Sequence, residues 1–529
     1  MKLSSAARIL PKWQNLLLAA ISSFLLILSF PDFEFYFLAW VGLLPLVLAI
    51  YRERETPVRA MIAGWVFGTI FFIGTVWWLT YSPINYGGFP PWLAYTLLVG
   101  VCAYVGIFPA VFAGLSAYLF KKFDLRAFIF LPFVWVLTEF LRYWLSGNSW
   151  NAVGYSQAFG SFLLPLAAVG GVYLVGFAVV TLNAFLASLL FSVSIYASHR
   201  SGSRTYAAAV VPAAVFVLLF MLVGWKTDAG SAAHSDQIKG TQTFIIVQVN
   251  VPMSGLDLSK WERLRERHVQ MAETALARIR GVGNSQPVTV VFPESPMNFM
   301  YKEDREFNKF IHDFARRNNI NVLFNSAEPD TETHTYFNSA VLVYGNGGEP
   351  GQYDKIYLVP FGEFVPGPLR AIVPGLIGSF ASGREYDVFD VDGTKAAVML
   401  CYESNFGQLS RALVAGGADY LIEMTNDGYL GDTPVLRQHL TSAVFRAVET
   451  NRPVMRATNV GITAFVTPRG EVLDAAPVYA EATRIWQVSA SAGDRTFYVR
   501  FGDWIAWLSL LIVLGACVFG RTERRKIAG

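Results

Sequence analysis

Apolar residues fill most of the first 225 positions of this chain of 529 residues, and another apolar run lies near its end. A helix that crosses a bilayer needs about 20 mostly apolar residues, because lipid offers no hydrogen-bond partner to a backbone N–H or C=O group. The pattern predicts eight such spans, at residues 14–30, 35–50, 60–79, 92–120, 127–144, 162–195, 206–224 and 503–520.

Residues 226–502 follow the different pattern of a water-soluble protein. Short β-branched or apolar runs alternate with segments of helical period, which is typical of an α/β domain. The runs predict strands at Thr243–Val251, Val288–Phe292, Asn321–Phe324, Ala340–Tyr344, Ala396–Leu400, Tyr420–Met424, 453–458, 463–467 and 484–489, and helices at 258–280, 303–318, 406–416 and 434–451.

The two patterns divide the chain into three parts. We expect a membrane domain with seven transmembrane helices at 1–225, an α/β domain at 226–502, and a C-terminal transmembrane helix with a basic tail at 503–529. The composition agrees with a large membrane-embedded part, because 53% of the residues are hydrophobic and 15% are charged. In a soluble chain about 25% of the residues are charged. The net charge of +3 is small, and no basic run with interleaved aromatics indicates a nucleic-acid partner.

Positive charge is confined to alternate loops of the predicted membrane domain. The loops near 31–34, 80–91 and 145–161 contain no Lys or Arg. Cationic loops stay in the cytoplasm, so both termini are predicted to be cytoplasmic and the α/β domain to lie outside. The cations are Lys2, Arg8 and Lys12; Arg52, Arg54 and Arg59; Lys121, Lys122 and Arg126; Arg200 and Arg204; and Arg521, Arg524, Arg525 and Lys526.

The first apolar run is also compatible with a signal peptide, because three cations precede it. However, no small-x-small cleavage site closes the run before Pro31, and a second apolar run follows at once. We therefore expect the run to remain as a transmembrane span.

Three strand-like runs of the α/β domain end on a reactive side chain: Glu294, Lys355 and Cys401. Ligands gather at the carboxyl ends of strands in α/β sheets, so these side chains can converge. A carboxylate can take the proton of a thiol, and an ammonium can hold the oxyanion formed when a carbonyl is attacked. Each residue taken alone also has a non-catalytic interpretation. Glu294 can be a turn or ion-pair residue, Lys355 a surface lysine, and Cys401 a small residue of the core.

Cysteine usage favours the catalytic interpretation of Cys401. Of the three cysteines, Cys102 and Cys517 lie inside apolar spans, and Cys401 is alone in the α/β domain. A compartment beyond the membrane is usually oxidising, so an unpaired thiol there indicates nucleophilic chemistry.

The motifs around these residues resemble those of the nitrilase superfamily, and the whole chain resembles the bacterial apolipoprotein N-acyltransferases. The resemblance implies an αββα sandwich with Glu294, Lys355 and Cys401 as its triad. The motifs are Pro293-Glu294-Ser295, the segment from Tyr353-Asp354-Lys355 to Pro366, Cys401-Tyr402-Glu403, and Thr425-Asn426-Asp427-Gly428-Tyr429.

The same resemblance implies supporting or substrate-binding residues, and the sequence also departs from the family's pattern. The supporting residues are Glu363, Glu403, Tyr402, Trp261, Asn426 and Tyr429. Phe292 stands where the family often has Trp, Gly428-Tyr429-Leu430 replaces Ala-Trp-Phe, and Val460 replaces Asn. These changes leave the triad intact but alter the expected shape of the substrate pocket.

The activity implied is transfer of a fatty acyl chain from a membrane phospholipid, phosphatidylethanolamine, to the N-terminal amine of a diacylated apolipoprotein through a Cys401 thioester. The resemblance implies a monomer without cofactor, in the bacterial inner membrane, with its catalytic domain periplasmic. The residues leave three alternatives open: a membrane-anchored amidase or nitrilase, a transporter, and a lipid-binding protein with a non-catalytic outer domain. The number of spans favours the transferase over a hydrolase of soluble substrates, which needs one anchor.

Two ionisable residues lie within a predicted span. Glu139 and Arg142 share a helix face at spacing i, i+3, and such residues are costly in a bilayer. They are expected either to stabilise helix packing or to contact a phospholipid headgroup. No metal site is predicted, since the histidines of the α/β domain show no metal-ligand spacing: His234, His268, His312, His334 and His439.

Overall fold

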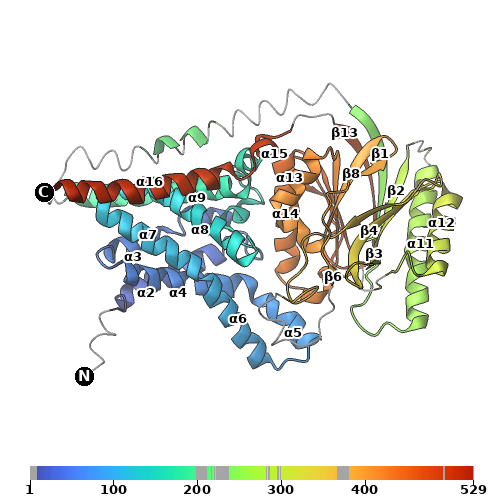
Figure 1. The fold of residues 1–529 in the computed structure, drawn as a ribbon, viewed down its shortest axis with the longest axis horizontal. Coiled ribbons are helices and arrows are strands. Elements are labelled where there is room, and N and C mark those ends of the chain that lie inside the picture. The colour runs from blue at the N-terminus through green and yellow to red at the C-terminus, as the bar shows by residue number, and fades with distance from the viewer. Residues whose placement is uncertain are drawn as a thin grey trace. The chain divides into compact units, whose positions relative to one another are not determined.

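The computed structural model describes residues 9–197, several positions between 211 and 221, and 238–281, 283, 286–294, 297, 299–365, 380–491 and 495–527. The chain forms two compact units. The helical unit contains residues 1–231, 433–441 and 501–529, and the α/β unit contains residues 232–432 and 442–500. Figure 1 shows the helices and strands of each unit.

The helical unit is built from apolar helices. Several begin with a proline in the first turn, where its missing N–H would have no partner in any case. Gly64 allows close packing of two helices, because a Cβ there would lie 2.5 Å from the carbonyl oxygen of Pro109. The helices are α2 (Trp13–Ile27), α3 (Leu44–Arg52), α4 (Pro57–Val76), α5 (Tyr81–Asn85), α6 (Pro91–Val105), α7 (Ile107–Phe123), α8 (Leu131–Ser146), α9 (Ala167–Ala197) and α16 (Trp504–Ile527).

The membrane character of this unit is confirmed, whereas the count of eight spans stays a prediction. Among the described residues, three helical stretches are long and apolar enough to cross a bilayer: Pro57–Asn85, Pro91–Ser146 and Leu164–Phe191. Shorter apolar helices cover Trp13–Ile27, Tyr36–Arg52 and Trp504–Val518. Most of the predicted span 206–224 lies outside the described residues.

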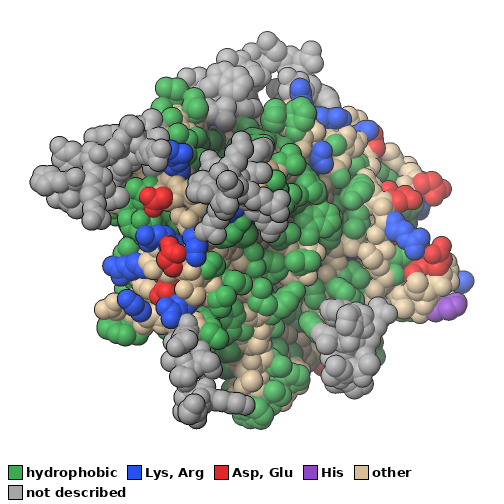
Figure 2. Space-filling view, turned by 60° about the vertical axis from the view of Figure 1, so that its left-hand side comes forward, with side chains coloured by type: hydrophobic (Ala, Val, Ile, Leu, Met, Phe, Trp, Pro, Cys, Tyr) green, Lys and Arg blue, Asp and Glu red, His purple; other side chains and the backbone are tan. Residues whose placement is uncertain are grey.

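Large apolar side chains cover much of the outer surface of the helical unit. Exposed fractions reach 69% for Trp92, 67% for Leu145 and 68% for Leu511. Figure 2 shows hydrophobic side chains spread over a broad face, with charged side chains gathered at its margins. Apolar exposure on this scale in a helical unit is what contact with lipid requires.

The α/β unit contains two sheets. Their strand orders are β13-β1-β2-β3-β4-β5, with β6 beside β4, and β12-β11-β10-β9-β8-β7. The strands are β1 (Ile238–Gln248), β2 (Val288–Val291), β3 (Asn321–Asp330), β4 (Thr335–Val343), β5 (Gly351–Asp354), β6 (Phe380–Ala381), β7 (Phe389–Val391), β8 (Thr394–Leu400), β9 (Tyr420–Thr425), β10 (Val454–Thr458), β11 (Ala464–Val466), β12 (Val472–Leu473) and β13 (Ala482–Ser491).

Side-chain alternation along the strands makes this unit a four-layer sandwich. Phe244 and Ile246 of β1 enter the core between the sheets, while Ile245 and Val247 pack towards α11 (Leu258–Gly281) and α12 (Arg305–Asn318). On the opposite side lie α13 (Gly407–Ala415) and residues 442–450 of α14 (Val435–Thr450), the part of that helix that belongs to this unit (Figure 1). The predicted αββα sandwich is therefore confirmed.

The hairpin of β3 and β4 is longer than predicted. The sequence pattern suggested Asn321–Phe324 and Ala340–Tyr344, but pairing continues as far as Asp330 and Thr335. The extension contains polar residues that hydrogen-bond across the hairpin, as Asn325 Nδ2 does to Asn338 Oδ1 at 2.7 Å. Hydrophobic period alone does not reveal strands of this kind. The short strands β6, β7 and β12 are likewise not predicted by the pattern, whereas β5 corresponds to the strand-like run that ends at Lys355.

Gln438 is a buried hydrogen-bond centre of the helical unit. Its Oε1 accepts from the indole N–H groups of Trp78 at 3.1 Å and Trp150 at 2.9 Å. Its Nε2 donates to the carbonyl oxygens of Thr75 at 2.9 Å and Pro31 at 3.3 Å. The amide thus satisfies polar groups from three segments of the unit, each of which is costly to bury without a partner.

Gln438→Leu should therefore lower the free energy of unfolding by about 2 kcal/mol, since buried donors and acceptors lose their partner. Thermal unfolding of the purified protein in detergent measures this loss. Gln270→Leu makes the same change at an exposed position and should shift stability by less than about 0.5 kcal/mol. Equal stability of the two variants would contradict the role given to Gln438.

Candidate active site

Two strand ends and the loop after one of them bring a lysine and two carboxylates together in the α/β unit. Lys355 follows β5 and is fully buried, with its Nζ 2.8 Å from Oε1 of Glu363 and 3.8 Å from Oε1 of Glu294. Glu294 follows β2 of the same sheet. The predicted convergence of these side chains is therefore present in the structure. Cys401 follows β8 of the second sheet and interacts electrostatically with both Glu294 and Lys355.

Cys401 lies on a sharp turn between β8 and the short helix η7 (Cys401–Asn405). Its φ of +49° lies in the left-handed region, which is uncommon for a residue with a side chain. Glu403 secures the turn, because its Oε2 accepts from the Leu400 N–H at 2.8 Å. The strand end therefore presents a partly exposed thiol on a backbone conformation that its surroundings maintain.

Glu403 also joins the Cys401 turn to the segment that carries Lys355. Its Oε1 accepts from the Tyr353 hydroxyl at 2.8 Å, the Ile356 N–H at 2.7 Å and the Tyr357 N–H at 3.1 Å. Burial raises the pKa of Glu403 to about 7, against the lowering effect of these donors and of Lys355. One carboxyl group thus fixes the positions of two predicted site residues.

Asn338 is a site residue that the sequence interpretation missed. Its Nδ2 donates to Oε1 of Glu294 at 2.9 Å and to Oε1 of Glu363 at 2.7 Å. Its carbonyl oxygen accepts from the backbone N–H of Lys355 at 2.9 Å. A buried asparagine inside a strand is a weak sequence signal, and here it orients all three charged groups.

The remaining predicted residues of this unit lie around the same cluster. The backbone N–H of Asn426 donates to Oε2 of Glu294 at 3.2 Å. The Trp261 indole donates to the carbonyl oxygen of Met297 at 3.1 Å, three residues beyond Glu294. Tyr402 packs edge-on against Phe406 at 5.1 Å.

Tyr429 lies on the short helix η8 (Asp427–Leu430) with 45% of its surface exposed. Its predicted role in substrate binding stays a prediction.

The electrostatics keep the lysine charged and the resting thiol protonated. Burial favours neutral Lys355, but the carboxylates of Glu363 and Glu294 prevail and raise its pKa above the ordinary value. Desolvation raises the pKa of the Cys401 thiol well above its usual range, Glu294 raises it further, and Lys355 opposes them. The thiol must therefore lose its proton before it can attack, and Glu294 is the charged group with the largest effect on its pKa. This arrangement can perform nucleophilic attack on a carbonyl carbon.

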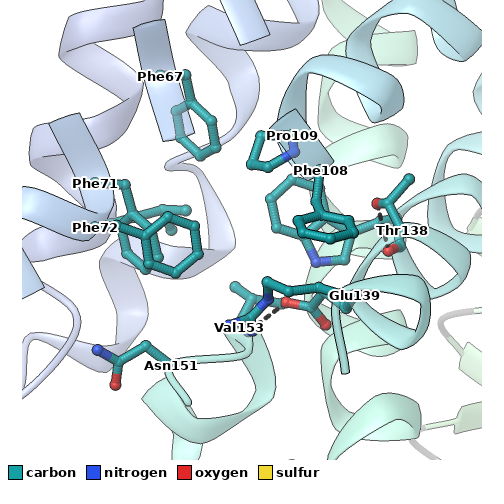
Figure 3. Close-up of a pocket in the computed structure, with 12 residues that line it drawn as sticks. Phe67, Phe71, Phe72, Phe108, Pro109, Thr138, Glu139, Asn151 and Val153 are labelled. Carbon is teal, nitrogen blue, oxygen red and sulfur yellow. Dashed lines mark hydrogen bonds between the residues drawn. The ribbon is translucent and has the colours of Figure 1, made fainter. Parts of the chain in front are cut away.

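Glu139 and Arg142 belong to a pocket of the helical unit (Figure 3). Glu139 Oε1 accepts from the Val153 N–H at 2.7 Å. Arg142 donates to the carbonyl oxygens of Trp150 at 2.7 Å and Ser149 at 3.3 Å. Both side chains therefore attach α8 to the loop that follows it, which favours the helix-packing interpretation.

The size of this pocket supports the same interpretation. Its walls are mainly apolar, and its cavity volume of about 20 Å³ is close to the 10–15 Å³ that one water molecule needs. Oε2 of Glu139 and Nδ2 of Asn151 have no hydrogen-bond partner among the described residues. The cavity has room for about one water molecule, whereas a phospholipid headgroup is far too large.

Comparison with protein families divides the chain in the same way as its structure. Residues 22–185 match the apolipoprotein N-acyltransferase N-terminal domain, and residues 264–496 match the carbon-nitrogen hydrolases. The chain is 31% identical over 527 residues to the apolipoprotein N-acyltransferase of Geobacter metallireducens, covering 97% of this chain and 96% of that protein. It is 28% identical to that of Pasteurella multocida, with 96% of each chain covered.

Solved structures of other proteins are similar to part of the chain. Saccharomyces cerevisiae Nit3, a member of the nitrilase superfamily, is 18% identical with a TM-score of 0.38, covering 48% of this chain and 92% of its own. An amidase from Nesterenkonia sp. is 16% identical with a TM-score of 0.36, covering 51% of this chain and 95% of its own.

The bridging role of Asn338 can be tested with Asn338→Asp, which keeps the side-chain shape but adds a carboxylate beside Glu294 and Glu363. Repulsion holds the pKa of the new carboxyl above its unfolded value. Its contribution to stability is thus present at low pH and lost as the pH rises through that pKa. We expect the melting temperature to fall further below that of the wild type at pH 8 than at pH 5.

Asn338→Leu is the control, because it adds no titratable group. Its melting temperature should lie below that of the wild type by the same amount at both pH values. If the fall in melting temperature caused by Asn338→Asp does not grow with pH, the side chains of Asn338, Glu294 and Glu363 are not in contact.

Proposed function

The chain belongs to the apolipoprotein N-acyltransferase family and has that acyltransferase activity; we propose that Cys401 is the nucleophile, Glu294 the general base and Lys355 the cation that holds the oxyanion. The observation that carries this proposal is the buried Lys355 ammonium between two carboxylates, in electrostatic contact with the thiol. A cation fixed before the reaction stabilises developing negative charge without reorganisation.

The first half-reaction transfers an acyl group from a membrane phospholipid to the enzyme. Glu294 takes the proton of Cys401, and the thiolate attacks the carbonyl carbon of an acyl ester. The tetrahedral oxyanion is stabilised by Lys355. When the C–O bond breaks, the lysophospholipid leaves with the proton returned by Glu294, and the acyl chain remains on Cys401 as a thioester.

The second half-reaction transfers the acyl chain to the lipoprotein. The N-terminal amine of the diacylated apolipoprotein attacks the thioester carbonyl, and Glu294 accepts a proton from the nitrogen. Collapse of the tetrahedral intermediate breaks the C–S bond, forms an amide and returns the proton to the Cys401 sulfur. The donor we propose is phosphatidylethanolamine, and Trp261, Tyr402 and Tyr429 are proposed to line the path of its chain.

The proposed orientation places the α/β unit in the periplasm and both termini in the cytoplasm. The support comes from loop charge, because the loops near 31–34, 80–91 and 145–161 contain no Lys or Arg, whereas the loops between them are cationic. Phospholipids and the lipid anchors of lipoproteins both lie in the membrane, which explains why this catalytic unit is attached to several apolar helices rather than to one.

The covalent mechanism predicts that the enzyme gains one acyl chain when it is given phospholipid without lipoprotein. Intact-mass measurement should show this addition on the wild type, labile to neutral hydroxylamine, but not on Cys401→Ser. Glu294→Gln should gain the chain at least about a hundredfold more slowly, because general-base catalysis contributes on the order of 10²–10⁴. Acylation of lipoprotein without the thioester would mean direct transfer, and rapid release of free fatty acid would favour the hydrolase alternative.

The orientation can be checked by cysteine labelling in intact spheroplasts. In a chain whose own cysteines are replaced by serine, Glu349→Cys lies on the exposed surface of the α/β unit and Arg126→Cys in a cationic loop. An impermeant maleimide should label the first position only, because the second is predicted to face the cytoplasm. Labelling of both positions, or of Arg126→Cys alone, would overturn the proposed orientation.

A further inference from the structure

A second buried ion cluster lies in the α/β unit, centred on Arg456 of β10. Its guanidinium is fully buried and bonds Oε1 of Glu423 at 2.5 Å and Oδ2 of Asp427 at 2.7 Å. Its Nε donates to the carbonyl oxygen of Ile462 at 3.1 Å. Two buried carboxylates and one buried cation therefore form a network whose cation makes hydrogen bonds in three directions.

The sheet register places this cluster directly behind the Cys401 turn. Glu423 of β9 pairs with Met399 of β8 on one side and with Arg456 on the other. Cys401 lies two residues beyond Met399, beside the end of β9. Electrostatic interactions of the thiol with both Asp427 and Arg456 agree with this placement.

The cluster also acts on the carboxylate of Glu294. Asp427, held by Arg456, directly follows Asn426, whose backbone N–H donates to Oε2 of Glu294 at 3.2 Å. Gly461 permits this arrangement, because a Cβ at that position would lie 2.4 Å from Oδ2 of Asp427. The position of Asp427 therefore sets the position of a hydrogen-bond donor to Glu294.

Charge balance beside the thiol depends on the same cation. Asp427 disfavours the thiolate, and Arg456 offsets it while also neutralising Glu423. Without the cation, two buried carboxylates would be left unpaired, a state that a low-dielectric interior strongly disfavours. The charged or titratable groups around the Cys401 sulfur and its turn are Glu294, Lys355, Glu363, Glu403, Asp427 and Arg456.

We propose that Arg456 is a positioning residue for the acyl transfer: it neutralises Asp427 behind the Cys401 sulfur and holds the Asn426 turn against Glu294. This inference rests on the proposed roles of Cys401 and Glu294. Arg456 itself touches neither substrate nor reacting atoms. Its signal in the sequence is a single cation within an apolar strand, Val454-Met455-Arg456-Ala457-Thr458.

The test is the pH dependence of Cys401 alkylation by iodoacetamide in the full-length protein, followed on the Cys401 peptide by mass spectrometry. Arg456→Met removes the cation, so the midpoint should move upward by about one pH unit. Asp427→Asn removes the carboxylate and should move the midpoint downward. The double variant should fall between them, and Arg456→Lys should stay close to the wild type.

Turnover supplies the second readout. Arg456→Met should lower kcat on the order of a hundredfold through misplacement of Glu294 and the thiol, with little change in KM, because no substrate contact is lost. Arg456→Lys should recover part of kcat, since it restores the charge but not the two-sided hydrogen bonding.

The outcomes separate this inference from the proposed function. If the midpoint of Cys401 alkylation can be measured in the wild type but both single variants leave it unchanged, or move it in the same direction, the inference is wrong. If Cys401 can be replaced without loss of acyl transfer, the proposed function fails instead. If Arg456→Met does not fold, Asp427→Asn and Arg456→Lys still decide the question. The inference requires a downward shift of the alkylation midpoint in Asp427→Asn, and the absence of that shift overturns it.

Discussion

The burial of the Lys355 ammonium is the constraint on which the active site depends. An isolated charge cannot be buried in a protein interior at acceptable cost, so Lys355 requires carboxylates close enough to form ion pairs. Glu363 at 2.8 Å and Glu294 at 3.8 Å meet this requirement. Those carboxylates need donors in turn, which Asn338 supplies to both of them. The site is therefore organised from the lysine outward.

The sandwich architecture makes this organisation possible. Glu294 and Lys355 come from one sheet and Cys401 from the other, so no single sheet contains the site. Glu403 connects them, because its two oxygens accept from both the Cys401 turn and the Lys355 segment. Behind the thiol, Arg456 performs a comparable function for a second set of carboxylates. Paired charges therefore lie near the Cys401 sulfur in both sheets.

The helical unit uses polar groups differently. Its outer surface is apolar, and its polar side chains are directed inward, where each needs an internal partner. The Gln438 amide hydrogen-bonds to two indole N–H groups and two carbonyl oxygens, and Glu139 and Arg142 hydrogen-bond to the loop after α8. These contacts attach helices and loops of the helical unit to one another.

The sequence by itself determined the division into an apolar helical part and an α/β part, most strands and helices, and the residues that follow the strand ends. These features are local, because hydrophobic period and motif spacing are read within a few residues. Tertiary structure alone decided which polar groups meet. Asn338 and Arg456 hydrogen-bond to partners up to 44 residues away in the chain. Such pairings depend on the register between strands, which the periodicity of apolar residues does not reveal. The same limit explains the polar extension of the β3–β4 hairpin, where hydrogen bonds across the strands replace the apolar pattern from which strands are predicted.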